Sequence, residues 1–534
     1  MSKLDQVSLQ SASRGLLLSV LLTSLVQAGQ ESDPFSPGLR WSRNSGSSAA
    51  WIPGKVRFTG EDQLVWAASG DFGAQIEAYS AWGDGQQLPM WAAEGFAPGV
   101  LISDVASGSE ASAFFALVRT QGTGGAADTL ELSCYAEPSL SAGAGAGSLW
   151  SVTGQAGLSG AALLACDEDA ERVCFATSNF QNKQVSLRWH AGLDGAILAE
   201  TSISVGEVDR LVMSADGSLT LCAAGERVWV WDSLGSLVHY EALSSELRFA
   251  DFTANGDELL LAHGNRARLM SRSSGGFLEI LRVDGGVGEL AACGAISGSG
   301  EGWSIAWCDV GAGSARYELY AGLSATLSAQ YVQPLGAQGL QNIPQTTCIT
   351  QDGERAVFAT WGGGEASEVL LLDAATGGLY WSLDLPGSAT DVALDRAGRR
   401  IAVAHKSVHA NQPSASGEVR LYDTGESDLV LTEAPRPGGA LRVEAKLDQA
   451  GFVFFLFGES VNSSQTLPFV QGELWVSLQS RLVVRARRAD ESGTARCALG
   501  LPLSLEGLAL SIQAVGRVGA GLVASETHLD LVVR

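Results

Sequence analysis

The strongest constraint on the fold of this chain is an internal repeat of short apolar segments. Eight segments, each entered through a polar turn, align so that one column always holds alanine preceded by a larger, mostly apolar residue. From first to last, these alanines span seven intervals that average about 48 residues. The column consists of Ala67, Ala116, Ala176, Ala223, Ala262, Ala306, Ala359 and Ala404. Such a period means that one supersecondary unit recurs along the chain, and the small residue suggests an inner strand where these units crowd together.

Each repeat reads as four short strands joined by hairpins. Turn dipeptides that tolerate positive φ, such as Asp216-Gly217 and Asp352-Gly353, precede several of the alanine segments. Two more strands follow, as in EVLLLDAATG from Glu368 and GLYWSLDL from Gly378. Four strands in about 40–50 residues are typical of a propeller blade. We therefore predict an all-β chain in which residues 38–434 form a β-propeller of about eight blades.

Two features leave the details of this propeller open. Insertions rich in Gly, Ser and Ala, such as residues 141–148, stretch two of the repeats, so seven blades is the alternative count. The segment GLRWS at Gly38–Ser42 resembles GLYWS at Gly378–Ser382, which suggests that the amino-terminal strand completes the last blade. The segment SDLVLTEA, Ser427–Ala434, competes for the same place.

A second, smaller domain is expected after the proline-rich break at residues 435–439. No alanine segment follows this break, and residues 440–534 contain six alternating runs separated by polar turns. Six strands in fewer than about 100 residues predict a small carboxyl-terminal β-sandwich.

The amino terminus has the features of an export signal. Lys3 and Arg14 precede or border an apolar run at Gly15–Leu25, and Val26-Gln27-Ala28 offers a small-x-small cleavage site. The run is shorter than the roughly 18 residues needed to span a bilayer. We expect residues 1–28 to be a signal peptide, and the remaining chain to be secreted, periplasmic or in the cell envelope without spanning a membrane.

Charge limits the partners that the chain can bind. The formal net charge is −24, which repels phosphate backbones, so no nucleic-acid partner is expected. The acidic run DEDAE, Asp167–Glu171, lacks the alternating spacing of a calcium loop. We predict no cofactor and no metal-binding residues, with Ca²⁺ as the one ion left open.

The cysteines and histidines are expected to be structural. None of the eight cysteines forms a C-x-x-C pair, and Cys166 and Cys174, which flank a predicted hairpin turn, are the best candidates for a disulfide. His263 and His405 directly follow the repeated alanine, so they could lie near the axis. We favour ordinary strand histidines there over metal ligands.

One blade carries a family resemblance. The segment LDAATGGLYWSLDL from Leu372 resembles the D-x-x-T-G-x-x-x-W repeat of the pyrroloquinoline-quinone propeller family, with Asp373, Thr376, Gly377 and Trp381 in those places. The segment VWVWDSLG is similar to WD-type blades. The resemblance implies a structural turn and a tryptophan that docks between blades. Redox members of the family also carry an adjacent cysteine pair, which this sequence lacks, so quinone chemistry is not expected.

The carboxyl-terminal region resembles a small β module of exported bacterial propeller proteins, through the stretch at Leu499–Gly516. The chain has no G-x-S-x-G elbow and no motif that assigns a catalytic residue. We therefore expect an exported, non-catalytic scaffold that binds a protein or polysaccharide. The alternatives are an enzyme that uses the propeller channel, namely a lyase, a glycosidase or a quinoprotein, and a self-associating structural protein of the envelope. Acid pairs with raised pKa in the channel would favour an enzyme, and an exposed apolar patch would favour a binding platform.

Overall fold

The computed structural model contains strands and no helix in the part of the chain that it describes. It describes residues 39–44, 52–59, 64–69, 75–81, 85–86, 89, 91–93, 100–108, 113–120, 122, 128–136, 148–153, 161–179, 181–335, 342–362, 366–396, 398–409, 416–424, 429–433, 440–446, 452–458, 460–465, 470–471, 474–476, 483–489, 494–500, 509–518 and 521–532. The predicted signal peptide lies outside these residues. No helix in the described residues has the length and apolar character needed to cross a bilayer.

Eight sheets, antiparallel except for the pairing of β1 with β5 in the last, account for the repeats and are numbered here in chain order. Sheet 1 contains β2 (Lys55–Thr59), β3 (Leu64–Ser69), β4 (Gln75–Ser80) and β6 (Trp91–Ala92). Sheet 2 contains β7 (Val100–Ala106), β8 (Ala113–Thr120), β9 (Thr129–Ala136) and β10 (Trp150–Thr153). Sheet 3 contains β11 (Ala162–Cys166), β12 (Arg172–Asn179), β13 (Gln184–Ala191) and β14 (Ile197–Ile203). Sheet 4 contains β15 (Arg210–Met213), β16 (Leu219–Ala224), β17 (Arg227–Asp232) and β18 (Leu237–Ala242).

The second half of the repeats follows the same order. Sheet 5 contains β19 (Leu247–Phe252), β20 (Glu258–His263), β21 (Arg266–Ser273) and β22 (Gly276–Asp284). Sheet 6 contains β23 (Leu290–Ile296), β24 (Gly302–Asp309), β25 (Ser314–Ala321) and β26 (Thr326–Pro334). Sheet 7 contains β27 (Ile343–Ile349), β28 (Arg355–Trp361), β29 (Val369–Asp373) and β30 (Gly378–Leu383). Sheet 8 contains β31 (Ala389–Leu394), β32 (Arg400–Lys406), β33 (Gly417–Asp423), β1 (Leu39–Asn44) and β5 (Gly85–Gln86).

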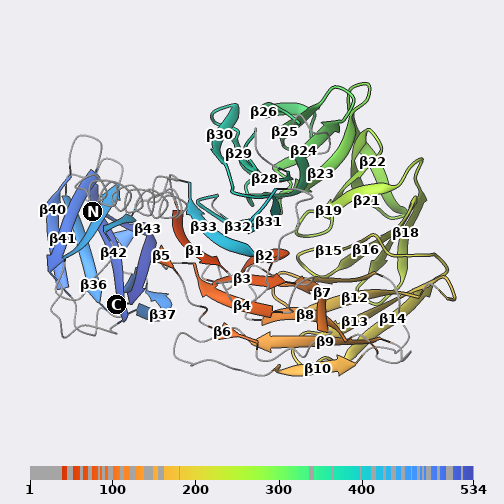
Figure 1. The fold of residues 1–534 in the computed structure, drawn as a ribbon, viewed down its shortest axis with the longest axis horizontal. Coiled ribbons are helices and arrows are strands. Elements are labelled where there is room, and N and C mark those ends of the chain that lie inside the picture. Colours follow the sequence, from red (N-terminus) through yellow and green to blue (C-terminus); the bar gives the residue numbers. More distant parts are fainter. Residues whose placement is uncertain are drawn as a thin grey trace, which may run out of the picture.

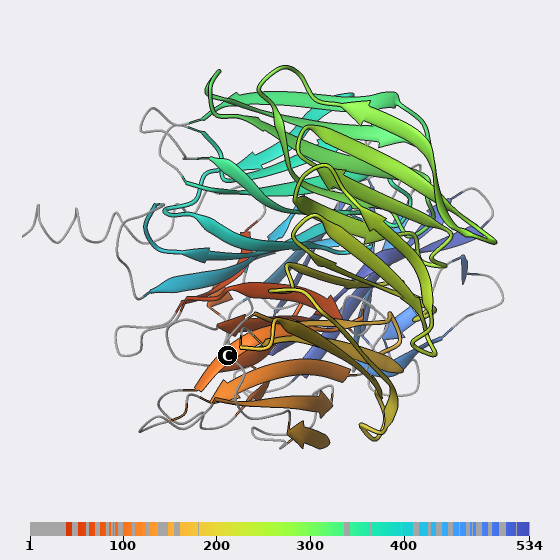
Figure 2. The same cartoon turned by 90° about the vertical axis from the view of Figure 1, so that its right-hand side faces the viewer.

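The sheets follow one another around a common centre (Figure 1), and from the side their strands succeed one another in chain order (Figure 2). From sheet 2 to sheet 7, the first strand of each sheet contacts the first strand of the sheet that follows it. In the last sheet, β31 contacts β2 of sheet 1. Sheets 1 and 2 meet through β3 and β7. The first strands therefore lie innermost, and the arrangement is consistent with blade-like repeats.

The alanine column lies on the second strand of all eight sheets, and each of its members is almost completely buried. Neighbouring sheets pack face to face there. One apolar cluster, for example, joins Leu221 and Ala223 of sheet 4 to Phe252 and Leu259 of sheet 5. A side chain larger than alanine in this column would meet the adjacent sheet, which explains why the position is small.

The amino-terminal strand takes the place in the last sheet that the sequence left open. β1 pairs with β33 in antiparallel register, with Trp41 opposite Leu421 and Asn44 opposite Glu418. Trp41 is buried between sheets 8 and 1, with its ring 5.1 Å from that of Tyr79 on β4. The competing segment instead forms β34 (Leu429–Glu433), which pairs with β35 (Ala440–Lys446).

The carboxyl-terminal strands form small sheets of their own. One has the order β34-β35-β41, where β41 is Thr494–Gly500. The other has the order β38-β43-β42-β36-β40, built from Val470–Gln471, Gly521–Val532, Ala509–Val518, Phe452–Gly458 and Val483–Arg488. A two-stranded pair joins β37 (Ser460–Gln465) and β39 (Leu474–Val476). The two larger sheets share one apolar core, which includes Val443, Phe455 and Ile512.

Candidate partner-binding surface

Three aspartates lie on innermost strands around the centre, and each binds the backbone of the next sheet. Asp104 is on β7, Asp251 on β19 and Asp391 on β31. Their carboxylates accept backbone N–H groups of β11, β23 and β2 at 2.9–3.0 Å, from Leu164, Ile296 and Val56 respectively. These carboxylates therefore link the innermost strands of adjacent sheets.

The charge state of these aspartates follows from their surroundings. Burial raises the pKa of Asp251 to about 6 and also raises the pKa of Asp104. Asp391 is paired with the Arg57 guanidinium at 2.5 Å. Raised pKa values at the centre are what a channel enzyme would need, but each of these oxygens already satisfies a backbone donor. The geometry therefore favours structural links over an acid–base pair.

The acidic run Asp167–Glu171 forms part of the hairpin turn between β11 and β12. Asp167 is buried, its Oδ1 accepts the N–H of Arg172 at 3.0 Å, and burial raises its pKa to about 6. Glu168 forms an ion pair with Arg396 of the corresponding turn in sheet 8. Among the described residues, no group of three His, Cys, Asp or Glu side chains is placed to hold a metal ion.

The two histidines beside the alanine column have separate local partners. His263 on β20 has Nδ1 3.2 Å from the Ser245 hydroxyl, and the fully buried His405 on β32 has Nδ1 3.0 Å from its neighbour's carbonyl oxygen. The other ring nitrogen of His405 lies 3.5 Å from Glu418. Both histidines therefore have contacts within their own sheets.

Cys166 and Cys174, the best candidates for a disulfide, are not bridged, because both thiols are free. Cys166 pairs across the hairpin with Val173, and Ala165 pairs with Cys174. Residues directly opposite in an antiparallel pair share a face, whereas neighbours along a strand point to opposite faces. The two cysteines therefore belong to different apolar clusters, on opposite faces of sheet 3.

The outermost strands of sheets 3 to 6 expose large apolar side chains to solvent. We call the following set the outer surface: Ile197 and Leu198 on β14, Leu237 and Tyr240 on β18, Leu278 and Ile280 on β22, and Leu327 and Val332 on β26. Leu278 is 63% exposed and Tyr240 is 51% exposed. Three of these strands, β14, β18 and β22, lie on the side of the molecule that faces the viewer in Figure 2. Exposed apolar groups that lie together mark interaction sites more often than scattered ones do, and of these strands β18 and β22 contact each other.

A repeated irregularity shapes these strands. The pairing register shifts by one residue within β14, β18, β22, β26 and β30, at the same place in each fourth strand. In β22 the extra residue is Ile280, between Glu279 and Leu281. A β-bulge turns side chains away from the regular alternation and makes an edge a poor template for another strand. In β14 and β22 the extra residue, Leu198 or Ile280, is one of the exposed apolar side chains, and all of these bulges interrupt the regular sheet edges.

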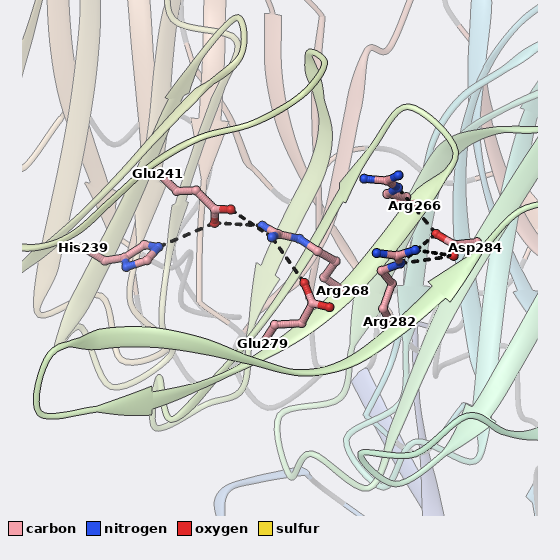
Figure 3. Close-up of polar contacts among 7 residues, drawn as sticks. All are labelled: His239, Glu241, Arg266, Arg268, Glu279, Arg282 and Asp284. Atoms are coloured by element: carbon pink, nitrogen blue, oxygen red, sulfur yellow. Dashed lines mark hydrogen bonds and ion pairs between the residues drawn. The ribbon is translucent and has the colours of Figure 1, made fainter.

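Charged residues connect the outer strands where β18 lies against β22 (Figure 3). Arg268 on β21 donates both terminal nitrogens to the Glu241 carboxylate of β18, at 2.8 and 2.9 Å, and reaches Glu279 at 3.4 Å. His239, whose Nε2 is 3.7 Å from the same carboxylate, and the Arg268 fork lower the pKa of Glu241 to about 2. The network holds sheets 4 and 5 together.

A second charged group continues along β22 in the same view. Arg282 forks Asp284 at 2.9–3.1 Å, and Arg266 lies 3.6 Å from the same carboxylate. The seam between sheets 4 and 5 thus combines exposed apolar groups with a fixed set of charges, which is the composition of an interface with an apolar centre and a polar rim.

This surface was not predicted from the sequence. Its signal was present in the fourth strand of each repeat. The β22 segment GFLEILRVD carries apolar residues at both parities, where a half-buried strand would alternate. Read alone, that pattern is equally consistent with a strand buried on both faces, so only the arrangement of the sheets distinguishes the two.

Comparison with known proteins gives no further guide to function. The sequence matches no protein-family model and no curated protein.

Proposed function

We propose that this protein is an exported, non-catalytic β-propeller scaffold of eight blades with a carboxyl-terminal β-sandwich, and that it binds a protein partner through the outer surface. The observation that carries the proposal is the run of exposed apolar side chains on the outermost strands of four successive sheets. The seven four-stranded sheets, the five-stranded last sheet and the contact between β31 and β2 support the propeller. The shared core of the two last sheets supports the sandwich.

The chemistry of the outer surface favours a protein over a polysaccharide. Six of the eight exposed side chains that define the outer surface are leucine or isoleucine, and Tyr240 is the single aromatic residue in the set. Sugar rings stack on aromatic faces, and in this set only Tyr240 offers one, whereas Tyr240 and the neighbouring arginines are residue types that are enriched at protein interfaces. A polysaccharide partner is therefore the outcome that the experiment below must separate from a protein.

The mode of binding follows from the bulges. A partner that added a strand to β22 would need a regular edge, and the register shift at Ile280 interrupts it. We therefore expect the partner to contact side chains such as Leu278 and Tyr240 rather than to extend a sheet.

Export is a separate part of the proposal. It depends on residues 1–28, and amino-terminal sequencing of the protein recovered from the medium or periplasm tests it. A mature chain that begins at Gly29 is the expected result, and a protein retained in the cytoplasm with Met1 intact would contradict export.

A capture experiment tests the binding function. Residues 29–534 would be immobilised and exposed to envelope extract and to extracellular polysaccharide, with and without Ca²⁺. The matched variants are Leu278→Lys on the outer surface and Val310→Lys, which is similarly exposed in the turn between β24 and β25. We expect a protein that the wild type and the Val310 variant retain and the Leu278 variant loses about tenfold. Equal retention by all three, or retention of polysaccharide alone, would contradict the proposal.

A further inference from the structure

The edge strand of the carboxyl-terminal sheet carries unpaired positive charge. β40 (VVRARR) is the terminal strand of its sheet in the described residues, and all six of its residues are exposed. Arg485 and Arg487 each donate to a carbonyl oxygen of their own strand, at 3.3 and 2.8 Å. Within the described part of the chain, neither of these arginines nor Arg488 forms an ion pair with a carboxylate.

This positive strand belongs to a region that differs in charge from the rest of the chain. Residues 440–534 contain nine Lys and Arg and nine Asp and Glu, so their net charge is zero. The preceding residues therefore carry the whole net charge of −24. Long-range electrostatic attraction would draw the arginine strand of one molecule toward the body of another.

The residues before 440 also form an acidic hollow. A shallow hollow of about 460 Å³ lies at sheet 4, lined by the connections between β14 and β15 and between β16 and β17. Its acidic side chains are Glu207, Asp209, Glu226 and Glu246; Arg227 is the one cation among the lining residues, and Arg248 lies 3.9 Å from Glu246. Glu207 and Asp209 accept the backbone N–H groups of Ala161 and Gly225, which fixes the wall of the hollow.

The two surfaces lie at opposite ends of the molecule. With the longest axis horizontal, Figure 1 places β40 at one end and β16 and β18 toward the other. The arginine strand of a molecule therefore points away from the acidic hollow of that same molecule.

We infer that a second copy of this chain docks the β40 arginines against the acidic hollow of sheet 4. Val483 and Val484 on the same strand are also exposed, which gives the contact an apolar component next to its charges. Because the two surfaces differ, the contact is heterologous, and each new subunit presents a further free surface, so the chain assembles head to tail. This inference does not depend on which partner binds the outer surface.

Charge reversal tests the contact on residues 29–534. One variant reverses the strand (Arg485→Glu, Arg487→Glu and Arg488→Glu), and another reverses the hollow (Glu226→Arg and Glu246→Arg). All five side chains are exposed, so folding should be preserved, and circular dichroism checks it. Arg272→Glu, an exposed residue of β21 outside both surfaces, controls for the change in net charge.

Sedimentation velocity over a concentration series is the readout. We expect the wild type and the Arg272 variant to associate at about 0.01 M salt, and to weaken about tenfold or more at about 0.15 M, where the Debye length falls from about 30 to about 8 Å. Each reversed variant alone should remain monomeric. An equimolar mixture of the two should associate again, because each supplies the complement of the other.

Three results would overturn the inference. They are a wild type that stays monomeric at low salt, association that survives reversal of the strand, and reversed variants that do not associate when mixed.

Discussion

Replacing Trp41 by alanine should open the sheet that joins the two ends of the repeats. Its indole is 1% exposed and packs between sheets 8 and 1, against Tyr79 and beside Val419. A buried tryptophan removes about 200 Å² from water, which at about 25 cal/mol/Å² is worth about 5 kcal/mol as an upper limit. Buried Trp→Ala substitutions cost about 3–5 kcal/mol. We therefore expect the free energy of unfolding to fall by about 4 kcal/mol, mainly because the pairing of β1 with β33 is weakened.

Hydrogen exchange on individual strands measures where this loss falls. In Trp41→Ala, the amides of residues 417–423 should exchange faster because β33 becomes an edge strand. Trp381→Ala is the matched control, since Trp381 holds the equivalent place on β30 and lies 5.6 Å from Tyr422 of the next sheet. It should expose residues 369–373 of β29 and leave the pairing of β1 intact. Unchanged exchange in β33 after the Trp41 substitution would refute the role of β1 in the last sheet.

Three further predictions concern charge, packing and cysteine chemistry. The folded-state pKa of Asp251, about 6, lies above the unfolded value of about 3.9, so this group lowers the free energy of unfolding by at most about 3 kcal/mol as pH rises from about 4 to about 6. In urea titrations at several pH values, Asp251→Asn should remove this part of the pH dependence. An unchanged pH dependence would count against it. Ala306→Leu should lower the free energy of unfolding by about 1–3 kcal/mol through overpacking, whereas Ala242→Leu, at an exposed position of β18, should change it by less than about 0.5 kcal/mol. Similar urea midpoints for the two variants would contradict the packing of the alanine column. A reducing agent should leave the Tm unchanged, and alkylation of the unfolded protein should label both Cys166 and Cys174; a bridged peptide in mass spectrometry would show otherwise.

The repeat made much of the fold predictable. A small residue that recurs at an average of about 48 residues identified the second strand of every sheet, because packing against a neighbouring sheet imposes the same steric limit at Ala67 as at Ala404. The likeness of GLRWS to GLYWS pointed to β1 as a fourth strand, which the register with β33 bears out. Local sequence could not choose between this strand and residues 429–433, because that choice depends on pairing between distant segments.

The candidate surface was harder to predict for a physical reason. Ile280 is the extra residue of a bulge, and the exposure of Leu278 depends on β22 being the terminal strand of its sheet; neither feature leaves a motif. Closeness in sequence made Cys166 and Cys174 the best candidates for a disulfide, but it says nothing about the face of a strand on which each lies. Shifting Cys166 by one position would have placed it opposite Cys174 on the same face.

Site-specific photo-crosslinking tests the binding function most directly. A benzophenone amino acid would replace Leu278 on the outer surface or, as the control, Val310, and each protein would be irradiated in envelope extract. The account predicts one discrete protein adduct from position 278 that is absent at position 310 and is competed away by unlabelled wild type. The same adducts from both positions, or none from position 278, would contradict the claim that the outer strands bind a protein partner.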